Sequence, residues 1–264
     1  FPTRTLFRSG QVFAKLARGR SEDIDLAVAA ARQALSGEWG RLTAAERGRV
    51  LARIATGVLA NIDLLTETEA RDVGKPLTQA RADVVALARY LEFYGASADK
   101  VHGDTIPYQN GFTVLTIYEP HGVTGHIIPW NYPMQILGRS LGAALAMGNA
   151  AVVKPAEEAC LTILEFARIA QEAGLPAGAL NIVTGFGAEA GAALSAHTDI
   201  NHISFTGSAR TGEMVQAAAA RNAVPVTLEL GGKSAQVVFA DADLDRAVPF
   251  LVNAGIQNAG QTCS

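Results

Sequence analysis

The chain has 264 residues, of which 49% are hydrophobic and 18% charged, with a formal net charge of -3 and a pI near 6.0. These values are ordinary for a globular protein and lack the basic surplus of a nucleic-acid binder. The apolar run 141–153 is too short to span a bilayer, and two cysteines build no disulfide framework, so we expect a cytoplasmic protein without membrane or nucleic-acid partners.

Helices dominate the predicted N-terminal part, after a short strand near residues 12–16. Ser21 is a candidate N-cap, because acidic residues follow it in the first turn. Thr43 and Glu46 have the spacing of a capping box. Two further helices are predicted at 64–72 and 77–97, and we interpret this region as scaffold.

The pattern changes after residue 102. Residues 105–108 and 112–118 flank Asn110-Gly111, which predicts a β-hairpin. Short apolar strands then alternate with helices, which is typical of parallel βαβ units. The predicted strands are 123–128, 150–153, 180–183, 202–205 and 224–228, and the predicted helices are 133–146, 161–173, 188–195 and 209–219. Another strand at 235–239 and a helix from Leu244 lead to the C-terminal cysteine.

Polar and glycine residues follow several of these strands, where ligands of parallel sheets bind. Lys154 is either a solvated lysine or a contact to a ribose hydroxyl, which Glu157 would share. The charge of Glu157 would repel a 2′-phosphate and so favours NAD over NADP. The spacing of Gly185, Gly187 and Gly191 departs from the dinucleotide fingerprint by one residue.

A better phosphate site is the segment 205–212, which follows a strand and opens a helix. The alternative is a simple turn in which Ser208 caps the helix. Asn131, between two prolines, is either a turn residue or an oxyanion donor. Glu229 is either a buried general base with a raised pKa or an ion-pair partner of Lys233.

Cys263 lies among small and polar residues, as a partly exposed and reactive thiol would. Cys160 lies in a helical stretch and is interpreted as a small buried residue. The five histidines and the cysteines show no metal-ligand spacing, so no metal site is expected.

Five motifs taken together resemble the NAD(P)-dependent aldehyde dehydrogenases, over nearly the whole chain from Val12 to Ser264. They are Ile127–Asn131, Val153–Glu157, Phe205–Ser208, Leu228–Ser234 and Gly260–Cys263, and they stand in the order found in that family. The interval from Glu229 to Cys263 also resembles the family's.

The resemblance implies a role for each motif. Cys263 would be the nucleophile, Asn131 the oxyanion donor and Glu229 the base that activates water for thioester hydrolysis. The cofactor, NAD with NADP as a possibility, would contact Ile128, Pro129, Trp130, Lys154, Glu157, Gly187, Phe205, Gly207, Ser208, Leu230 and Gly231. The substrate would be an aldehyde, and Tyr132, Ile136 and Arg139 would face its tunnel.

The resemblance also implies an α/β fold with a Rossmann-like, doubly wound parallel sheet. The NAD-binding domain would comprise 1–101 and 120–231, with an oligomerisation hairpin at 102–119 that implies a homodimer or homotetramer. Residues 232–264 would begin a catalytic domain, which in the family continues for about another half-chain, so the 264 residues alone are expected to be nearly inactive. Thr5–Ser9 replaces a turn that the family usually has, which suggests that these residues are not native chain.

Two other functions remain. A catalytically inactive nucleotide-binding or assembly subunit would use the same fold, although it would be free to lose Cys263, Glu229 and Asn131. CoA-acylating members of the family generally lack the glutamate, so Glu229 favours hydrolysis to a free acid. For the substrate, Arg139 either favours an aldehyde that bears a carboxylate or is a surface or inter-domain arginine.

Overall fold

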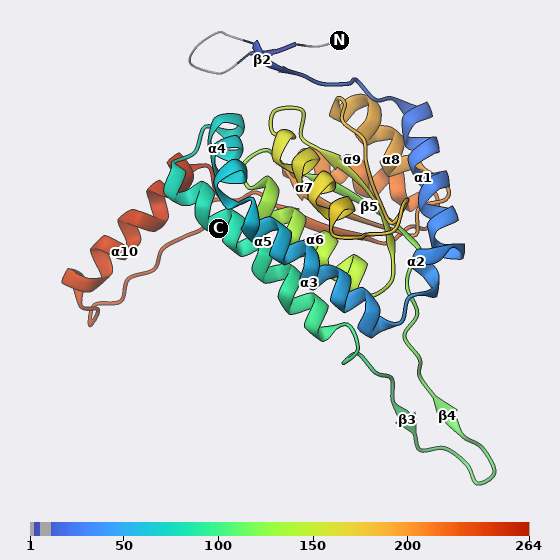
Figure 1. Ribbon diagram of the computed structural model, residues 1–264. Helices are drawn as coiled ribbons and strands as arrows, with labels where there is room; N and C mark the ends of the chain where they lie inside the picture. The colour runs from blue at the N-terminus through green and yellow to red at the C-terminus, as the bar shows by residue number, and fades with distance from the viewer. Residues whose placement is uncertain (1–2, 6–11, 264) are drawn as a thin grey trace.

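The computed structural model describes residues 3–5 and 12–263 (Figure 1). Its centre is a five-stranded sheet in the order β7-β6-β5-β8-β9, with every neighbouring pair parallel. The strands are β5 (Val123–Ile128), β6 (Ala150–Pro155), β7 (Leu180–Ile182), β8 (His202–Gly207) and β9 (Val226–Leu230). The chain adds β6 and β7 on one side of β5 and then β8 and β9 on the other. The predicted doubly wound sheet is therefore confirmed, with its switch point between β5 and β8.

Helices cover both faces of the sheet (Figure 1). One layer holds α6 (Pro133–Ala146) and α7 (Leu161–Glu172), backed by α3 (Ala44–Ala60), α4 (Ile62–Val73) and α5 (Leu77–Ser97). The other holds α1 (Ser21–Ser36), which leads into α2 (Glu38–Arg41), with η1 (Gly187–Gly191), α8 (Ala192–Ala196) and α9 (Ala209–Ala220). Because both faces are covered, the central strands are apolar, and residues 150–153 are completely buried.

Several predicted boundaries agree with the structure. β5, α5 and α6 have the predicted limits, and the Thr43 capping box is present, since the Thr43 N–H donates to the Glu46 carboxylate at 2.8 Å. The prediction that Ser21 caps α1 is wrong. Arg20 is the N-cap, and Asp23 accepts its N–H at 2.8 Å, so Ser21 is already the first helical residue.

One further prediction needs correction, and another is confirmed. The helix expected at 188–195 is a π-helical turn, η1, followed by the short α8. The strand at residue 12 is confirmed as β2 (Val12–Lys15), which pairs with β1 (Thr3–Thr5), a strand that the sequence did not reveal. Residues 6–9, most of the segment suspected of being non-native, lie outside the described residues.

The end of the chain departs most from prediction. β9 begins and ends two residues later than expected, so Glu229 lies inside the strand. No strand forms at 235–239, because no neighbouring strand runs beside it within the described residues; Val237 and Phe239 are largely exposed there. The predicted helix is present as α10 (Leu244–Ile256), which projects from the body and has no buried residue (Figure 1).

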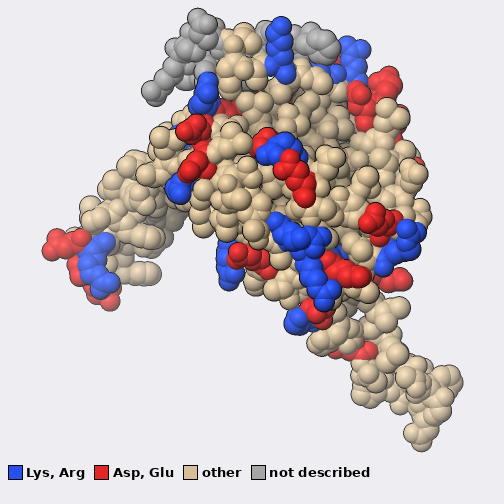
Figure 2. Space-filling view, viewed as in Figure 1, with Lys and Arg blue, Asp and Glu red and all other residues tan. Residues whose placement is uncertain are grey.

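The predicted hairpin is an arm that extends far from the body (Figure 1). Its paired strands, β3 (Thr105–Ile106) and β4 (Val114–Leu115), are shorter than expected. Residues 105–118 contain no Lys, Arg, Asp or Glu, and Figure 2 shows the arm as an almost uncharged projection. Tyr108 and Phe112 form an exposed edge-to-face pair near its tip. Within the described part of the chain, no helix has the length and apolar character needed to cross a membrane.

Candidate functional site

A cleft of about 490 Å³ opens at the carboxyl ends of the strands, beside the switch point between β5 and β8. Residues 261–263 also line this cleft, although they lie far in sequence from the strands that form it. Of the predicted site residues, the cleft is lined by Ile128, Pro129, Trp130, Asn131, Lys154, Glu157, Gly187, Phe205, Gly207, Ser208, Gly231 and Cys263. Tyr132 and Ile136, expected at the substrate tunnel, line it too.

Cys263 is exposed and follows a strained turn. The turn lies in and just after η2 (Gln257–Gly260), where Asn258, Ala259 and Gly260 have φ values of 48°, 57° and 75°. Non-glycine residues in this left-handed region cost about 1–3 kcal/mol each and persist only where surrounding contacts hold them. The segment before the thiol therefore has a defined shape that its neighbours must maintain.

Asn131 is one of those neighbours. Its side-chain Nδ2 donates to the Gln261 carbonyl at 2.9 Å, and its own carbonyl accepts from Asn258 Nδ2 at 3.1 Å. A primary amide has two N–H donors, so one remains for another acceptor in the cleft. Asn131 therefore does not act only on its own backbone, as a simple turn residue would. It connects the end of β5 to the cysteine segment.

Lys154 and Glu157 form an ion pair inside the cleft. The lysine is 2% exposed, and its Nζ lies 2.8 Å from Glu157 Oε2. Burial is the largest single effect on the pKa of Glu157 and would raise it, but the hydrogen bond and charge of Lys154, together with backbone N–H groups, hold that pKa below its ordinary value. The other carboxylate oxygen accepts the N–H of Gly187 at 3.5 Å. The interpretation of Lys154 as a solvated lysine is wrong.

The turn from β8 to α9 combines a capped helix N-terminus with a close approach of glycines to their neighbours. Ser208 caps α9 by accepting the Thr211 N–H at 3.2 Å, a contact that fits a simple capped turn and a phosphate site equally. A Cβ on Gly207 would come within 2.6 Å of the Phe205 ring, so only glycine fits there. A Cβ on Gly212 would likewise meet Leu230 at 2.7 Å, which places Leu230 against α9.

Glu229 and Leu230 are not among the residues that line the cleft. Glu229 pairs in register with Thr206 and is exposed, so the expected burial is wrong. Within the described residues it also makes no ion pair with Lys233. Glu229 and Cys263 make small contributions to the raised pKa of Arg139, for which the hydrogen bond with Tyr90 is the main reason. Glu229 and Cys263 thus lie within electrostatic range of one arginine.

Arg139 itself lies outside the cleft. Its Nε donates to the Tyr90 hydroxyl at 2.9 Å, and its guanidinium lies 5.6 Å from the centre of the same ring. It lines a neighbouring cleft of about 420 Å³ with His126 and His202. These contacts favour the interpretation of Arg139 as a structural arginine, because its guanidinium is held by Tyr90.

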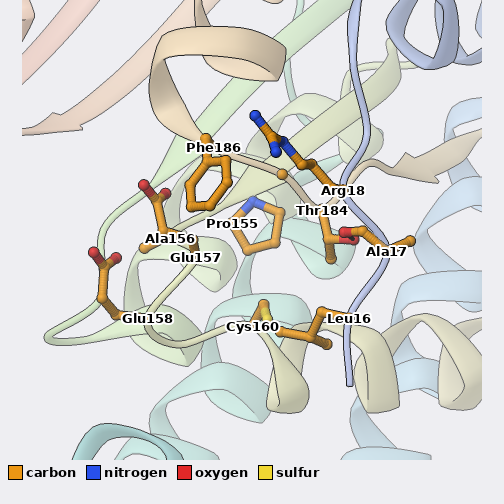
Figure 3. A pocket seen from close by; sticks show the side chains of 11 residues that line it. Leu16, Ala17, Arg18, Pro155, Ala156, Glu157, Glu158, Cys160, Thr184 and Phe186 are labelled. Carbon is orange, nitrogen blue, oxygen red and sulfur yellow. Dashed lines mark hydrogen bonds between the residues drawn. The ribbon is translucent and has the colours of Figure 1, made fainter. Parts of the chain in front are cut away.

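A smaller cavity of about 280 Å³ adjoins the Lys154 side of the cleft, and Ala156 and Glu157 line both (Figure 3). Phe186 and Pro155 lie next to each other on its wall, and Cys160, which also lines it, is almost fully buried as predicted. The one guanidinium on its wall, Arg18, is paired with Glu189. The carboxylates of Glu157 and Glu158 make this region unfavourable for an added phosphate.

Sequence reasoning assigned no role to several residues at the site, although most of them lie within the motifs that it singled out. Thr206, Thr211, Gln261 and Thr262 line the cleft, and Asn258 binds the Asn131 backbone. Asn258 carried a usable signal, since asparagine tolerates left-handed backbone and this one precedes Ala-Gly. The others are ordinary polar residues whose positions depend on the fold.

Comparisons with known proteins identify related sequences over nearly the whole chain. The family profile described as "Aldehyde dehydrogenase family" matches residues 6–264. The chain is 48% identical to "Aldehyde dehydrogenase family 2 member B4, mitochondrial" of Arabidopsis thaliana, over 97% of this chain and 48% of that protein. It is 46% identical to "Hydroxyisobutyraldehyde dehydrogenase" of Mycolicibacterium austroafricanum, over 97% of this chain and 50% of that protein. The chain thus spans about half the length of the curated relatives it matches.

Solved structures are similar over the same half. A putative aldehyde dehydrogenase from Burkholderia cenocepacia has 68% identity and a TM-score of 0.95, and covers 97% of this chain with 54% of its own. An NAD+ complex of aldehyde dehydrogenase from Bacillus cereus has 41% identity and a TM-score of 0.96, over 98% of this chain and 54% of its own.

Proposed function

Because this chain belongs to the aldehyde dehydrogenase family, we propose that it carries the cofactor site and the nucleophile of an enzyme that oxidises an aldehyde to a carboxylic acid with NAD(P). One observation carries the proposal. Asn131, Cys263 and the Lys154–Glu157 pair, which come from distant parts of the sequence, line one cleft at the switch point of the sheet. An aldehyde oxidation of this kind needs a nucleophile, an oxyanion donor and a cofactor site close together.

The residues present fit a dinucleotide. Glu157, held by Lys154 and the Gly187 N–H, would accept hydroxyl hydrogens of the adenine-side ribose, and its charge favours NAD over NADP. The capped N-terminus of α9, with Gly207 and Ser208, would receive the pyrophosphate. Ile128, Pro129, Trp130, Phe205, Leu230 and Gly231 would complete the surroundings. The similar Bacillus cereus enzyme, solved as an NAD+ complex, supports this assignment.

In the proposed reaction, the Cys263 thiolate attacks the aldehyde carbon to form a C–S bond, while the remaining Asn131 N–H stabilises the oxyanion. A hydride then leaves this carbon, and its C=O bond re-forms as a thioester; a nicotinamide held in the cleft would accept this hydride. Glu229 takes a proton from water, which attacks the thioester. The C–S bond breaks, and the carboxylic acid and the thiolate are released.

Single-turnover formation of NADH tests this function. The full-length protein and its Cys263→Ala variant are mixed with propanal and NAD and followed by absorbance. We expect one NADH per active site from the wild type and none from the variant. If no aldehyde in a panel gives a signal that depends on Cys263, the alternative of an inactive nucleotide-binding or assembly subunit replaces this proposal.

Three finer features belong to the same proposal. The domain limits are 1–101 with 120–231 for the cofactor domain, 102–119 for the arm and 232–264 for the start of the catalytic domain. The uncharged, exposed arm would join copies into a homodimer or homotetramer, which sedimentation of an arm-deleted variant would test. A cytoplasmic location rests on the cysteine usage, whereas the Arabidopsis thaliana relative is named mitochondrial, so localisation of a tagged chain is the test.

A further inference from the structure

A fully buried ammonium lies beneath the start of α6. Lys75, in the turn between α4 and α5, has a side chain that is 0% exposed. Its Nζ lies 2.5 Å from Asp83 Oδ2 and 3.3 Å from Glu69 Oε1, and both carboxylates are also 0% exposed. Buried ion groups are costly to desolvate, and apolar residues of the same size often stabilise a fold at least as well. Stability alone is therefore a weak reason for this cluster.

The cluster is tied to the helices around it. Glu69, on α4, accepts a hydrogen bond of 2.7 Å from the Thr162 hydroxyl on α7. Asp83, on α5, accepts from Gln79 at 2.8 Å and from Gln135 at 2.6 Å. Gln135 lies in the first turn of α6, three residues after Tyr132 and four after Asn131. The position of the ammonium is thus fixed by four helices, and one of them begins at the site.

The ammonium also contacts the aromatic ring of Tyr132, a residue that lines the cleft. Lys75 Nζ lies 4.4 Å from the centroid of the Tyr132 ring, within the range of a cation–π contact, and Tyr132 is 7% exposed. The hydroxyl of Tyr132 accepts from Gln257 Nε2 at 3.2 Å. Gln257 begins the turn that leads to Cys263. The ring of Tyr132 is therefore held by the buried cation, and its hydroxyl is held by the segment that leads to the cysteine.

We propose that Lys75, fixed by Glu69 and Asp83, is a positioning residue that orients Tyr132 and, through it, the amide of the adjacent Asn131 against the cysteine segment. Lys75 is not among the residues that line the cleft. An oxyanion donor must lie about 2.7–3.1 Å from the developing charge, so a small shift of Asn131 weakens the transition state. The inference rests on the proposed function, since it assigns a residue to the same reaction.

The test removes the cation together with one of its two carboxylate partners; the other, Glu69, keeps the hydrogen bond from the Thr162 hydroxyl and, buried without a cation, takes up a proton. Lys75→Met is combined with Asp83→Asn in the full-length protein, because methionine keeps the packing and asparagine keeps an acceptor for Gln79 and Gln135. We expect kcat to fall on the order of 100-fold, as for a misplaced catalytic group, while the Kd for NAD, read from Trp130 fluorescence, stays unchanged. Lys75→Arg, which keeps a cation over the ring, should recover part of this loss.

Two controls separate positioning from plain structural support. Lys100→Met removes an exposed lysine and should change nothing. Ile54→Val loosens a fully buried position in α3 and should lower Tm without lowering kcat at the assay temperature. Hydrogen exchange should become faster in 129–135 and 257–263 of the double variant and stay unchanged in the sheet.

The outcomes are distinct. An unchanged kcat in the folded double variant overturns the inference, as does a kcat loss that Ile54→Val reproduces at equal Tm loss. If the wild type forms no NADH through Cys263, the proposed function fails instead. In that case, hydrogen exchange still tests whether Lys75 orders residues 129–135 and 257–263. If exchange in these two segments of the double variant is no faster than in wild type, or rises equally everywhere, Lys75 does not order them.

Discussion

The side chain of Asn131 and the backbone of Gln261 are joined by a hydrogen bond of 2.9 Å, which connects the end of β5 to the segment two residues before Cys263. The carbonyl of Asn131 is held in turn by Asn258. One residue thus shapes the nucleophile segment and keeps one N–H for the reaction. This double use explains why the left-handed residues 258–260 hold their shape although Cys263 is exposed.

Replacing Asn131 should therefore affect chemistry more than binding. We expect Asn131→Ala to lower kcat about 100- to 1,000-fold, the usual loss for one oxyanion donor, with the Kd for NAD unchanged. Asn110→Ala, in the arm turn, is a matched control that should keep full kcat. Steady-state kinetics of the two full-length variants give the answer, and a kcat for Asn131→Ala within twofold of wild type would remove Asn131 from the mechanism.

Glu157 should decide between NAD and NADP. Its carboxylate is paired with Lys154, and the residue lines the cleft that would hold the ribose. Glu157→Gln removes the charge that would repel a 2′-phosphate, so we expect the ratio of kcat/KM for NADP to that for NAD to rise on the order of tenfold. Glu158→Gln, at the exposed neighbouring position, should raise the ratio much less, because water and salt screen its charge. An unchanged ratio in Glu157→Gln would mean that other groups set the preference.

The buried carboxyl of Glu69 should make the free energy of unfolding decrease as pH rises. Burial raises its pKa from 4.5 to about 7, against the opposing charge of Lys75. Because the folded state binds this proton more tightly than the unfolded state, the stabilisation is complete below about pH 4.5 and is lost as pH rises to about 7. A difference of this size corresponds to roughly 3 kcal/mol in the free energy of unfolding.

Denaturant unfolding of Glu69→Gln across this pH range isolates the contribution of Glu69. In wild type, the free energy of unfolding should fall between about pH 4.5 and 7, and in Glu69→Gln this fall should be absent. Glu67→Gln, at an exposed position on the same helix, should show the same fall as wild type. Parallel pH profiles for wild type and Glu69→Gln would contradict the assignment.

The buried imidazole of His126 should have the opposite effect, making the free energy of unfolding decrease as pH falls. Burial, with a smaller contribution from the charge on His202, lowers its pKa from 6.5 to about 3. The folded state therefore resists protonation of His126, and the stabilisation present above about pH 6.5 is lost as pH falls toward about 3. The full difference corresponds to roughly 5 kcal/mol.

His126→Gln cannot be protonated in this range and should be less acid-labile than wild type. Thr124, which contacts His126 Nε2 at 2.9 Å, would still have an amide partner. The exposed His102→Gln serves as control. Equal acid unfolding midpoints for His126→Gln and wild type would show that His126 is protonated in the fold without cost.

Local patterns predicted much of the fold. These patterns depend only on residues that are close together in the sequence. Examples are the alternation of strands and helices, Pro133 at the start of α6 and the Thr43–Glu46 pair. The carboxyl ends of the strands then predicted where the cleft would be. The part that failed depends on distant contacts. Glu229 lies in a strand because β8 extends beside it, and residues 235–239 form no strand because nothing within the described chain does so for them.

Lys75 shows the same limit at the site. Its sequence neighbours, Gly74 and Pro76, indicate a turn, where lysines are normally solvated. Only the meeting of α4, α5, α6 and α7 buries it beside Glu69 and Asp83. Residues that act through such contacts carry no local signal, whereas Cys263 and Asn131 stood out by residue type and motif.

The central claim is that the substrate becomes bonded to Cys263. Its most direct measurement uses the full-length Glu229→Gln variant, in which the thioester should accumulate because the base for hydrolysis is missing. After mixing with propanal and NAD, peptide mass spectrometry should find a propanoyl group on Cys263, in equal amount to the NADH formed, and none on Cys160. NADH formation without acylation of Cys263, or equal NADH formation by Cys263→Ala, would contradict the account.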